Sequence, residues 1–159
     1  MILAIEELTN KIHNTSYTYT IQGNIFPETM PRYDVFTLRE PLCNAIAHQD
    51  YTKAALIDVV EFIDDRLLFR NHGRFIPSSV EDVVKRDFPE ENYRNPFLVE
   101  AMRNVKMVET EGGGIRKLFM QQKKRFFPMP SYDLSDGMVV CEVMGNILDE
   151  NFAKILVNN

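Results

Sequence analysis

Hydrophobic positions recur along this chain with two periods, which predict where its helices and strands lie. Five segments have the spacing of an amphipathic helix or begin at a helix-capping residue, and a sixth is discussed below. Five others alternate between polar and apolar residues or are rich in Ile, Val and Phe, as half-buried strands are. The predicted helices are residues 2–13, 78–86, 95–105, 115–126 and 147–157. The predicted strands are residues 16–21, 53–63, 66–70, 132–134 and 138–144, the last two joined by a turn at 135–137.

The sixth predicted helix, residues 37–51, has a polar stripe on an otherwise apolar surface. Glu40, Asn44 and His48 are spaced at i, i+4 and i+8, so they share one face of a helix. Apolar residues occupy most of the remaining surface, which predicts that the helix is buried nearly all round. Because buried polar groups are costly without hydrogen bonds, the stripe must meet protein groups, water or a polar ligand.

The start of this helix allows a purely structural interpretation of one stripe residue. Thr37 and Glu40 have the spacing of a capping box, in which Thr37 is the N-cap and Glu40 reaches back to its backbone. Pro41 then falls in the first turn, where a missing backbone donor costs little. Asn44 has no capping role one turn further in, and Asn is a poor mid-helix residue. We therefore interpret Asn44 as part of a ligand site or a structural network.

The order of elements predicts an α+β fold, a two-layer sandwich with helices on one face of a mixed or antiparallel sheet. Strands arrive mostly as hairpins, such as the one that turns at Asp64 and Asp65, and the helices are segregated from them. Residues 23–32, which include Pro27 and Pro31, are predicted to be a loop. We expect residues 1–159 to form a single domain, and interpret the chain as part of a longer protein because helices are predicted near both ends.

Composition narrows the classes of function. The hydrophobic content of 45% and charged content of 26% are ordinary for a globular protein, and no apolar run has the length of a membrane span. The first residues lead into Glu6 and Glu7 without a basic leader, so we expect a cytoplasmic protein. Cys43 and Cys141 lie in separate apolar segments and are interpreted as core residues. Three histidines without ligand spacing do not predict a structural metal site.

Charge argues against this domain as a main nucleic-acid-binding surface. The formal net charge is −5, whereas phosphate recognition needs a clustered excess of Lys and Arg. The one basic run, Lys123-Lys124-Arg125, is interpreted as the solvated end of a helix, where the dipole favours cations.

Two loops have the composition of ligand-binding segments. Residues 110–115 place Gly112, Gly113 and Gly114 directly before a helix, where exposed backbone donors and the helix dipole favour an anion such as phosphate. Residues 71–77 follow a predicted strand with a polar residue and a glycine turn. A flexible helix connection and an ordinary hairpin exit are the structural alternatives for these two segments.

Together these segments resemble the C-terminal ATPase-like domain of RecG-related predicted transcriptional regulators, which is similar to the GHKL superfamily of gyrase, heat-shock chaperone, histidine kinase and MutL ATPase domains. The resemblance extends over residues 2–134. It rests on Arg39-Glu40-x-Leu42-x-Asn44-Ala45-x-x-His48-x-Asp50-Tyr51, Asp65-Arg66-Leu67, Arg70-Asn71-x-Gly73, Arg94-Asn95-Pro96 and Glu111-Gly112-x-Gly114-Ile115.

The resemblance implies a GHKL-type sandwich that binds ATP with Mg²⁺ and assigns roles to individual residues. Glu40 matches the acid that activates water, and Asn44 the amide that holds Mg²⁺ against the phosphates. Asn71 stands where the superfamily has an aspartate that binds adenine, and Gly73 lies in the following turn. Gly112, Gly113 and Gly114 match the phosphate lid, and His48 extends the nucleotide-binding stripe.

The sequence also departs from the superfamily pattern. Asn71 replaces the charged aspartate, and bulky Arg74 and Phe75 stand where a second glycine is usual. Two hypotheses follow. The first is an ATP- and Mg²⁺-binding regulatory domain of a transcriptional regulator with weak or no hydrolysis, which reaches DNA through other domains of the full-length protein. The second is a degenerate, non-catalytic module that serves interdomain or homodimer contacts. Neither hypothesis involves a membrane.

Overall fold

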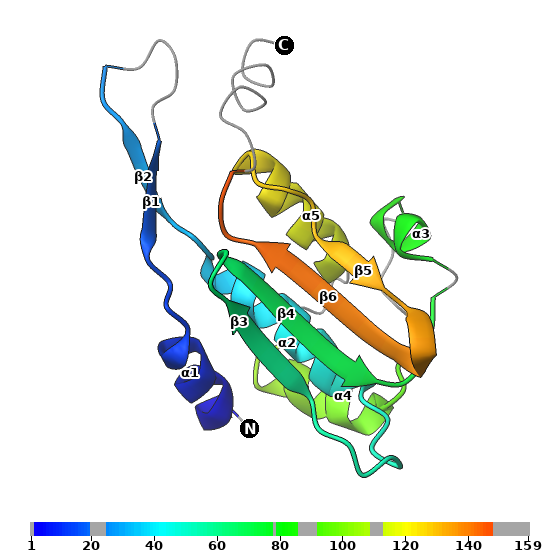
Figure 1. Cartoon of the computed structure of the whole chain (residues 1–159). Helices are drawn as coiled ribbons and strands as arrows, with labels where there is room; N and C mark the ends of the chain where they lie inside the picture. The colour runs from blue at the N-terminus through cyan, green and yellow to red at the C-terminus, as the bar shows by residue number, and fades with distance from the viewer. Residues whose placement is uncertain (1, 20–24, 78, 86–91, 109–112, 148–159) are drawn as a thin grey trace.

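A four-stranded sheet with helices on one face forms the body of this computed structural model (Figure 1). The structure describes residues 2–19, 25–77, 79–85, 92–108 and 113–147. The helices are α1 (Ile2–Lys11), α2 (Val35–His48), α3 (Val80–Lys85), α4 (Pro96–Asn104) and α5 (Gly114–Lys124), with a 3₁₀ turn η1 (Ser135–Gly137). The strands are β1 (Ser16–Tyr19), β2 (Glu28–Pro31), β3 (Asp58–Phe62), β4 (Arg66–His72), β5 (Ser131–Asp133) and β6 (Met138–Met144).

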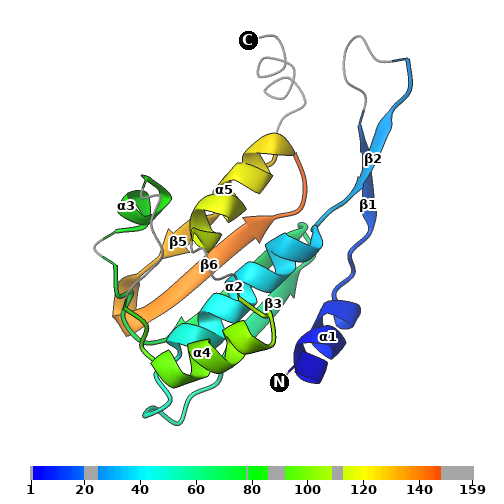
Figure 2. The ribbon, with the colours of Figure 1, turned by 180° about the vertical axis from the view of Figure 1, so that it is seen from behind.

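The sheet has the strand order β3-β4-β6-β5, and all its described pairs are antiparallel. Helices α2, α4 and α5 lie on one face, as the view from behind shows (Figure 2). The α+β sandwich predicted from the sequence is therefore confirmed, and of the mixed and antiparallel alternatives the described strands form the antiparallel one.

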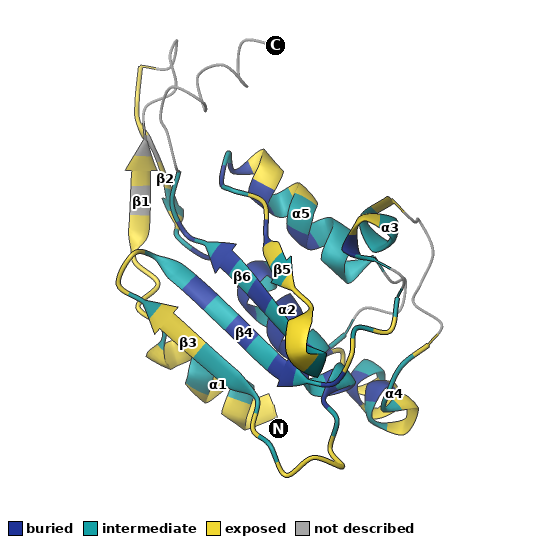
Figure 3. Cartoon of the chain, turned by 45° about the vertical axis from the view of Figure 1, so that its right-hand side comes forward, coloured by how far each residue is buried: buried dark blue, intermediate teal, exposed yellow. Residues whose placement is uncertain are grey.

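Alternation along β4 decides which side chains face the helices. Leu67, Phe69 and Asn71 are buried, whereas the residues between them are half-buried on the other face of the sheet. Figure 3 shows this alternation of dark blue and teal along β4. The core between sheet and helices consists of Tyr33, Leu38, Leu42, Leu67, Phe69, Leu118, Cys141 and Val143. A second cluster joins α2 to α4 and consists of Cys43, Ala47, Val99, Met102 and Met107. Both cysteines are buried and free, as predicted.

Helix α2 begins earlier than the capping-box interpretation predicts. Asp34 is the N-cap: its carboxylate accepts hydrogen bonds from the Thr37 backbone N–H at 2.7 Å and the Thr37 hydroxyl at 3.0 Å. The prediction of Thr37 as the cap was wrong, because Asp34 provides both a cap acceptor and a negative charge at the positive end of the helix. Pro41 is consequently inside the helix, and Glu40 lies in the second turn, where it has no capping role.

The loop predicted at residues 23–32 contains a strand. Residues 28–31 form β2, which pairs with β1 in an antiparallel two-stranded sheet that projects from the sandwich (Figure 1). Pro31 is compatible with this strand because it lies at the end of the register, opposite Ser16, in a sheet that has only edge strands. Where the structure describes them, the other predicted strands and helices are present close to their expected bounds, except that the strand predicted from residue 53 begins only at Asp58. Residues 148–157 of the predicted last helix lie outside the described part.

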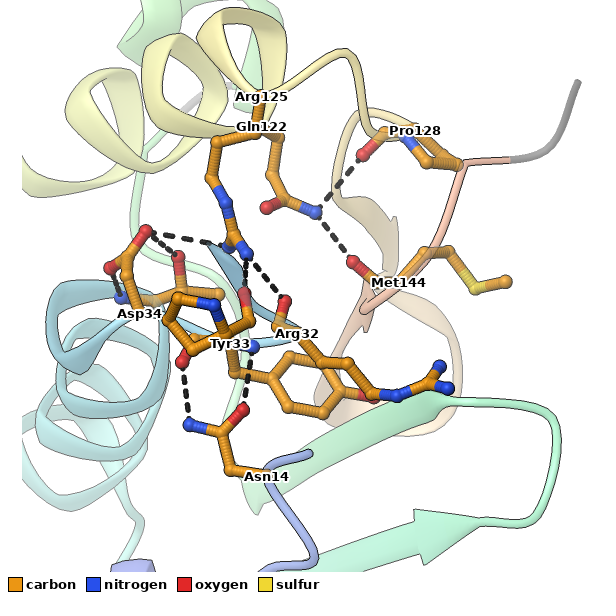
Figure 4. A network of polar contacts seen from close by, with 10 residues as sticks. Asn14, Arg32, Tyr33, Asp34, Gln122, Arg125, Pro128 and Met144 are labelled. Carbon is orange, nitrogen blue, oxygen red and sulfur yellow. Dashed lines mark hydrogen bonds and ion pairs between the residues drawn. The ribbon is translucent and has the colours of Figure 1, made fainter. Parts of the chain in front are cut away.

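A buried arginine ties the end of α5 to the start of α2 (Figure 4). Arg125 is 8% exposed; its Nη2 donates to the carbonyls of Pro31 and Arg32, the latter at 2.8 Å, and its Nη1 lies 3.5 Å from the Asp34 carboxylate. The solvated run predicted at residues 123–125 is thus correct for Lys123 and Lys124, which are exposed, and wrong for Arg125. Through this network the helix cap and the exit of the β1–β2 hairpin share one charged partner.

Candidate functional site

A cavity of about 510 Å³ lies between α2, the sheet and the start of α5. This volume falls within the range of roughly 300–1,000 Å³ that is typical of small-molecule sites. Its walls come from α2, from β4, β5 and β6, and from the segments at 74–77, 92–93 and 113–115. The residues of the predicted stripe that line it are Glu40, Asn44 and His48. The sequence-predicted stripe therefore faces a cavity large enough for a ligand.

One end of the cavity holds Glu40 and Asn44 beside the first residue of α5. The Asn44 side-chain amide donates to Glu40 Oε1 at 3.1 Å, and Glu40 is only 7% exposed. A β-carbon built on Gly114 would overlap the Glu40 carboxylate, so the acid packs directly on the glycine α-carbon. The positive end of the α5 dipole favours a carboxylate at this place. The same position would favour a phosphate oxygen.

The glycine segment is described only in part. Gly113 and Gly114 line the cavity, with Gly113 as the N-cap of α5 at a φ of 74°. A β-carbon on Gly113 would meet nothing within 4 Å. Gly112 lies outside the described residues.

His48 marks the other end of the cavity, two helical turns from Glu40. Eight residues of α-helix separate the two side chains by about 12 Å along the axis. The His48 ring stacks on Tyr93, with ring centroids 5.5 Å apart. Burial, with a further contribution from the Arg94 charge, lowers the pKa of His48 to about 4. At neutral pH the cavity is therefore lined here by an uncharged imidazole.

Asn71 lies near this end, on the helix-facing side of β4. Its side chain is 4% exposed, and its amide nitrogen donates to the His72 carbonyl at 3.2 Å. Gln49, at the end of α2, accepts from the His72 backbone N–H at 2.8 Å and thereby holds this strand end against the helix. With its nitrogen directed to the backbone, the Asn71 carbonyl oxygen is the group suited to accept a hydrogen bond from a ligand.

Gly73 does not line this cavity, although the resemblance places it in the nucleotide turn. It has a φ of 120°, and its backbone N–H donates to the Gly137 carbonyl at 2.9 Å. A β-carbon there would approach Arg94 Nε to 2.9 Å and the His48 carbonyl to 3.1 Å. The glycine is therefore needed for packing beneath the cavity wall.

Sequence reasoning noted Arg74 and Phe75 only as departures, and it missed Tyr93 and Tyr132. All four residues line the cavity. Tyr132 lies between two aromatic rings, Phe75 at 6.5 Å and Phe119 at 6.3 Å between centroids. Phe75, Phe119 and Tyr132 lie in three separate segments of the sequence, and only the fold brings their rings together. No periodic pattern in the sequence therefore indicates this cluster.

The sulfur and phenol groups in the cavity are not set up for nucleophilic chemistry. Burial raises the pKa of Cys141 to about 12, and burial raises the pKa of Tyr132 well above its ordinary value; the charge of Glu40 contributes to both shifts. Cys141 therefore stays a thiol at neutral pH, and thiolate is the reactive form of cysteine. Among the described residues that line the cavity, Glu40 is the one acidic side chain.

The described residues contain no group of three or more His, Cys, Asp or Glu side chains placed to hold a metal ion. A Mg²⁺ ion in this cavity would accordingly depend on Asn44, Glu40, water and oxygen atoms of the ligand itself, as Mg²⁺ bound with nucleotide phosphates commonly does. In the described part of the chain, every helix is too short or too polar to cross a membrane.

Comparisons with known proteins place this chain in a family. Residues 59–142 match the family described as “Putative ATP-dependent DNA helicase recG C-terminal”. The chain belongs to this RecG C-terminal family. The matched region includes Asn71, Gly73 and the glycine segment of the RecG C-terminal domain, whereas Glu40, Asn44 and His48 precede it.

A solved structure shares the fold of this RecG C-terminal domain. The DIP2311 protein from Corynebacterium diphtheriae superposes with a TM-score of 0.72 over 90% of the chain, at 22% sequence identity. The chain spans 28% of the length of that protein. A comparison with curated proteins gives no significant match.

Proposed function

We propose that this RecG C-terminal domain binds ATP together with Mg²⁺ and acts as a regulatory domain of a transcriptional regulator. The observation that supports the proposal is the arrangement of one cavity along α2. Glu40 and Asn44 lie beside the start of α5 at one end, and His48 and Asn71 lie at the other. An elongated ligand with an anionic end and a polar ring fits this arrangement.

The α5 end suits the phosphates and the metal. A helix amino terminus that starts with glycines presents backbone donors to an anion. Asn44 can turn its carbonyl oxygen to Mg²⁺ once its bond to Glu40 is released, and Mg²⁺ prefers oxygen ligands. Because Glu40 is negative and buried, phosphates need the metal to offset the repulsion between them and this carboxylate. Binding is therefore expected to be strongly Mg²⁺-dependent.

The opposite end of the cavity, near His48 and Asn71, suits the adenine base of ATP. The Asn71 carbonyl accepts a hydrogen bond from an exocyclic amino group, and the Tyr93 ring and the uncharged His48 ring provide flat surfaces beside it. Without the charge of an aspartate, this hydrogen bond is about half as strong as a charge-assisted one. We expect weaker binding than in relatives that carry the acid.

Hydrolysis is expected to be weak or absent. A carboxylate that activates water must have access to that water beside the terminal phosphate. Here Glu40 accepts from Asn44 and packs against Gly114, so it must leave this position before it can orient a water molecule. The proposal leaves DNA contact to other domains of the full-length regulator.

The contact between Glu40 and Asn44 also favours a second candidate, a non-catalytic module for interdomain or dimer contacts. In that case Glu40, Asn44 and His48 stabilise the folded protein and bind no ligand. Asn44→Ala then lowers the stability of the ligand-free protein, because the buried Glu40 loses a hydrogen bond. An unchanged melting temperature in this variant would argue against that candidate.

The test is equilibrium binding of a non-hydrolysable ATP analogue by calorimetry, with and without Mg²⁺, in the wild type and in Asn44→Ala. The proposal predicts that the variant loses the Mg²⁺-dependent part of the affinity. Asn104→Ala, the same change at an exposed position at the end of α4, is the matched control and keeps wild-type affinity. Full Mg²⁺-dependent binding by Asn44→Ala would remove the basis of the proposal.

A further inference from the structure

Three consecutive residues ahead of α4 hold the carboxyl end of α2. The Tyr93 ring stacks on His48, Arg94 Nε donates to the His48 carbonyl at 3.0 Å, and the Asn95 amide donates to the carbonyls of Ala47 and Gln49 at 3.0 and 2.9 Å. These carbonyls belong to the last turn of a helix, where no intrahelical donor remains for them. The segment therefore caps α2 with side chains.

Arg94 reaches further than the other two. Its Nη2 donates to the Arg74 carbonyl at 2.9 Å, while its Nε remains on the His48 carbonyl. His48 and Arg74 belong to different walls of the cavity, α2 and the segment after β4. One planar guanidinium group thus joins both walls, a geometry that the single ammonium of lysine cannot reproduce.

The path of Arg94 explains the glycine at position 73. A β-carbon on Gly73 would lie 2.9 Å from Arg94 Nε and 3.1 Å from its Cζ. The left-handed φ of 120° also favours glycine. The Arg94 side chain therefore packs directly against Gly73, and a larger residue at position 73 would displace it.

We propose that Arg94 is a positioning residue that sets the spacing between His48 and Arg74 and so shapes the end of the cavity that receives the base. This inference rests on the proposed function for its ligand, although the bridge itself is a property of the free protein. Arg94 contributes through the two carbonyls and is not itself among the residues that line the cavity.

The charge of Arg94 gives a second, ligand-independent readout. Among the described residues, Arg94 is the charged group that acts on His48, and its charge reinforces burial in lowering the pKa of His48. Removal of the guanidinium while the fold is kept must therefore raise the pKa of His48. A cap that served only helix stability would leave nucleotide affinity unchanged in the folded variant.

The experiment compares Arg94→Gln and Arg94→Lys with the wild type, by calorimetry with the ATP analogue and by NMR titration of the histidines, with His48→Gln to assign the His48 signal. Arg70→Gln is the matched control, because Arg70 pairs with Asp58 on the sheet face opposite the cavity. Circular dichroism confirms that each variant is folded.

We expect Arg94→Gln to bind the analogue about tenfold more weakly than the wild type, and we expect this loss to be the same with and without Mg²⁺. The pKa of His48 should rise in this variant. Arg94→Lys loses affinity but keeps the low pKa. Wild-type affinity in a folded Arg94→Gln variant would overturn the proposal. If the wild type itself does not bind, the proposed function fails, and NMR alone tests the bridge between His48 and Arg74. Unchanged His48 titration together with unchanged amide shifts at residues 74–76 in Arg94→Gln would then overturn the inference.

Discussion

The carboxylate of Glu40 rests directly on the α-carbon of Gly114, the first residue of α5. A hydrogen bond from Asn44 holds it there. The acid expected to activate water and the helix end expected to receive phosphate thus contact each other in this structure. Under the proposed function, each has to exchange this contact for one with the nucleotide, so the pair would control binding.

The contact predicts an unusual response to Gly114→Ala. Alanine normally stabilises a helix relative to glycine by about 1 kcal/mol. Here its β-carbon overlaps the carboxylate, so we expect a loss of about 1–3 kcal/mol in the free energy of unfolding, as in other overpacked sites. Urea denaturation of the wild type and the variant measures the loss.

Two comparisons isolate the cause. In a Glu40→Ala background the overlap is removed, and Gly114→Ala should become neutral or stabilising. Gly113→Ala meets no atom within 4 Å, so it should cost only the roughly 1 kcal/mol of its left-handed backbone in either background. An equal effect of Gly114→Ala in both backgrounds would show that Glu40 is not the obstacle.

The buried network around Arg125 predicts a second effect on stability. Arg125→Met leaves the carbonyls of Pro31 and Arg32 without their shared donor and removes the ion-pair partner of the Asp34 carboxylate (Figure 4). Loss of one partner of a buried, charged network costs roughly 3 kcal/mol in the free energy of unfolding. The exposed neighbour Lys124→Met is the control and should change stability by no more than about 0.5 kcal/mol. Equal effects of the two substitutions in urea denaturation would contradict the network's role.

Stability should also depend on pH through His48. Its pKa is about 4 in the folded protein and 6.5 in the unfolded chain, so between these values the unfolded state binds the extra proton. Stability therefore rises with pH across this window, by up to about 1.4 kcal/mol per pH unit, and the contribution is complete above pH 6.5.

Denaturation of the wild type and His48→Gln between pH 5 and 8 tests this dependence. Glutamine cannot titrate, so the slope below pH 6.5 should decrease in the variant. Identical slopes in both proteins would mean that His48 titrates normally and is not held in a desolvated site. The range avoids the lower pH values at which carboxylates titrate as well.

The sequence predicted the parts of the structure that repeat a local pattern. The stripe of Glu40, Asn44 and His48 needs only the helical period, and all three of its residues line the cavity. The paired strands around Asp64 and Asp65 carry their own turn, which is why the hairpin was predicted correctly.

The features of the structure that were not predicted depend mainly on contacts between segments that are distant in the sequence. Thr37 has the spacing of a cap, but Asp34 three residues earlier takes that role, and its charge also pairs with Arg125, far along the chain. Gly73 has the signature of a nucleotide turn, yet its neighbour is the Arg94 side chain. Asp34 is itself a preferred N-cap residue near Thr37, so a local pattern could have identified the cap. Arg125 and Arg94 lie far in the sequence from Asp34 and Gly73, so no local pattern could identify these two partners.

The most direct test of the central claim is a thermal-shift titration of the domain with a non-hydrolysable ATP analogue, with and without Mg²⁺. A ligand that binds only the folded state raises the melting temperature, and at a hundred times its Kd the stabilisation is about 2.7 kcal/mol. We predict a concentration-dependent rise, most of which depends on Mg²⁺, and the Mg²⁺-dependent part disappears in Asn44→Ala. No shift at millimolar analogue with Mg²⁺ would contradict nucleotide binding by this domain.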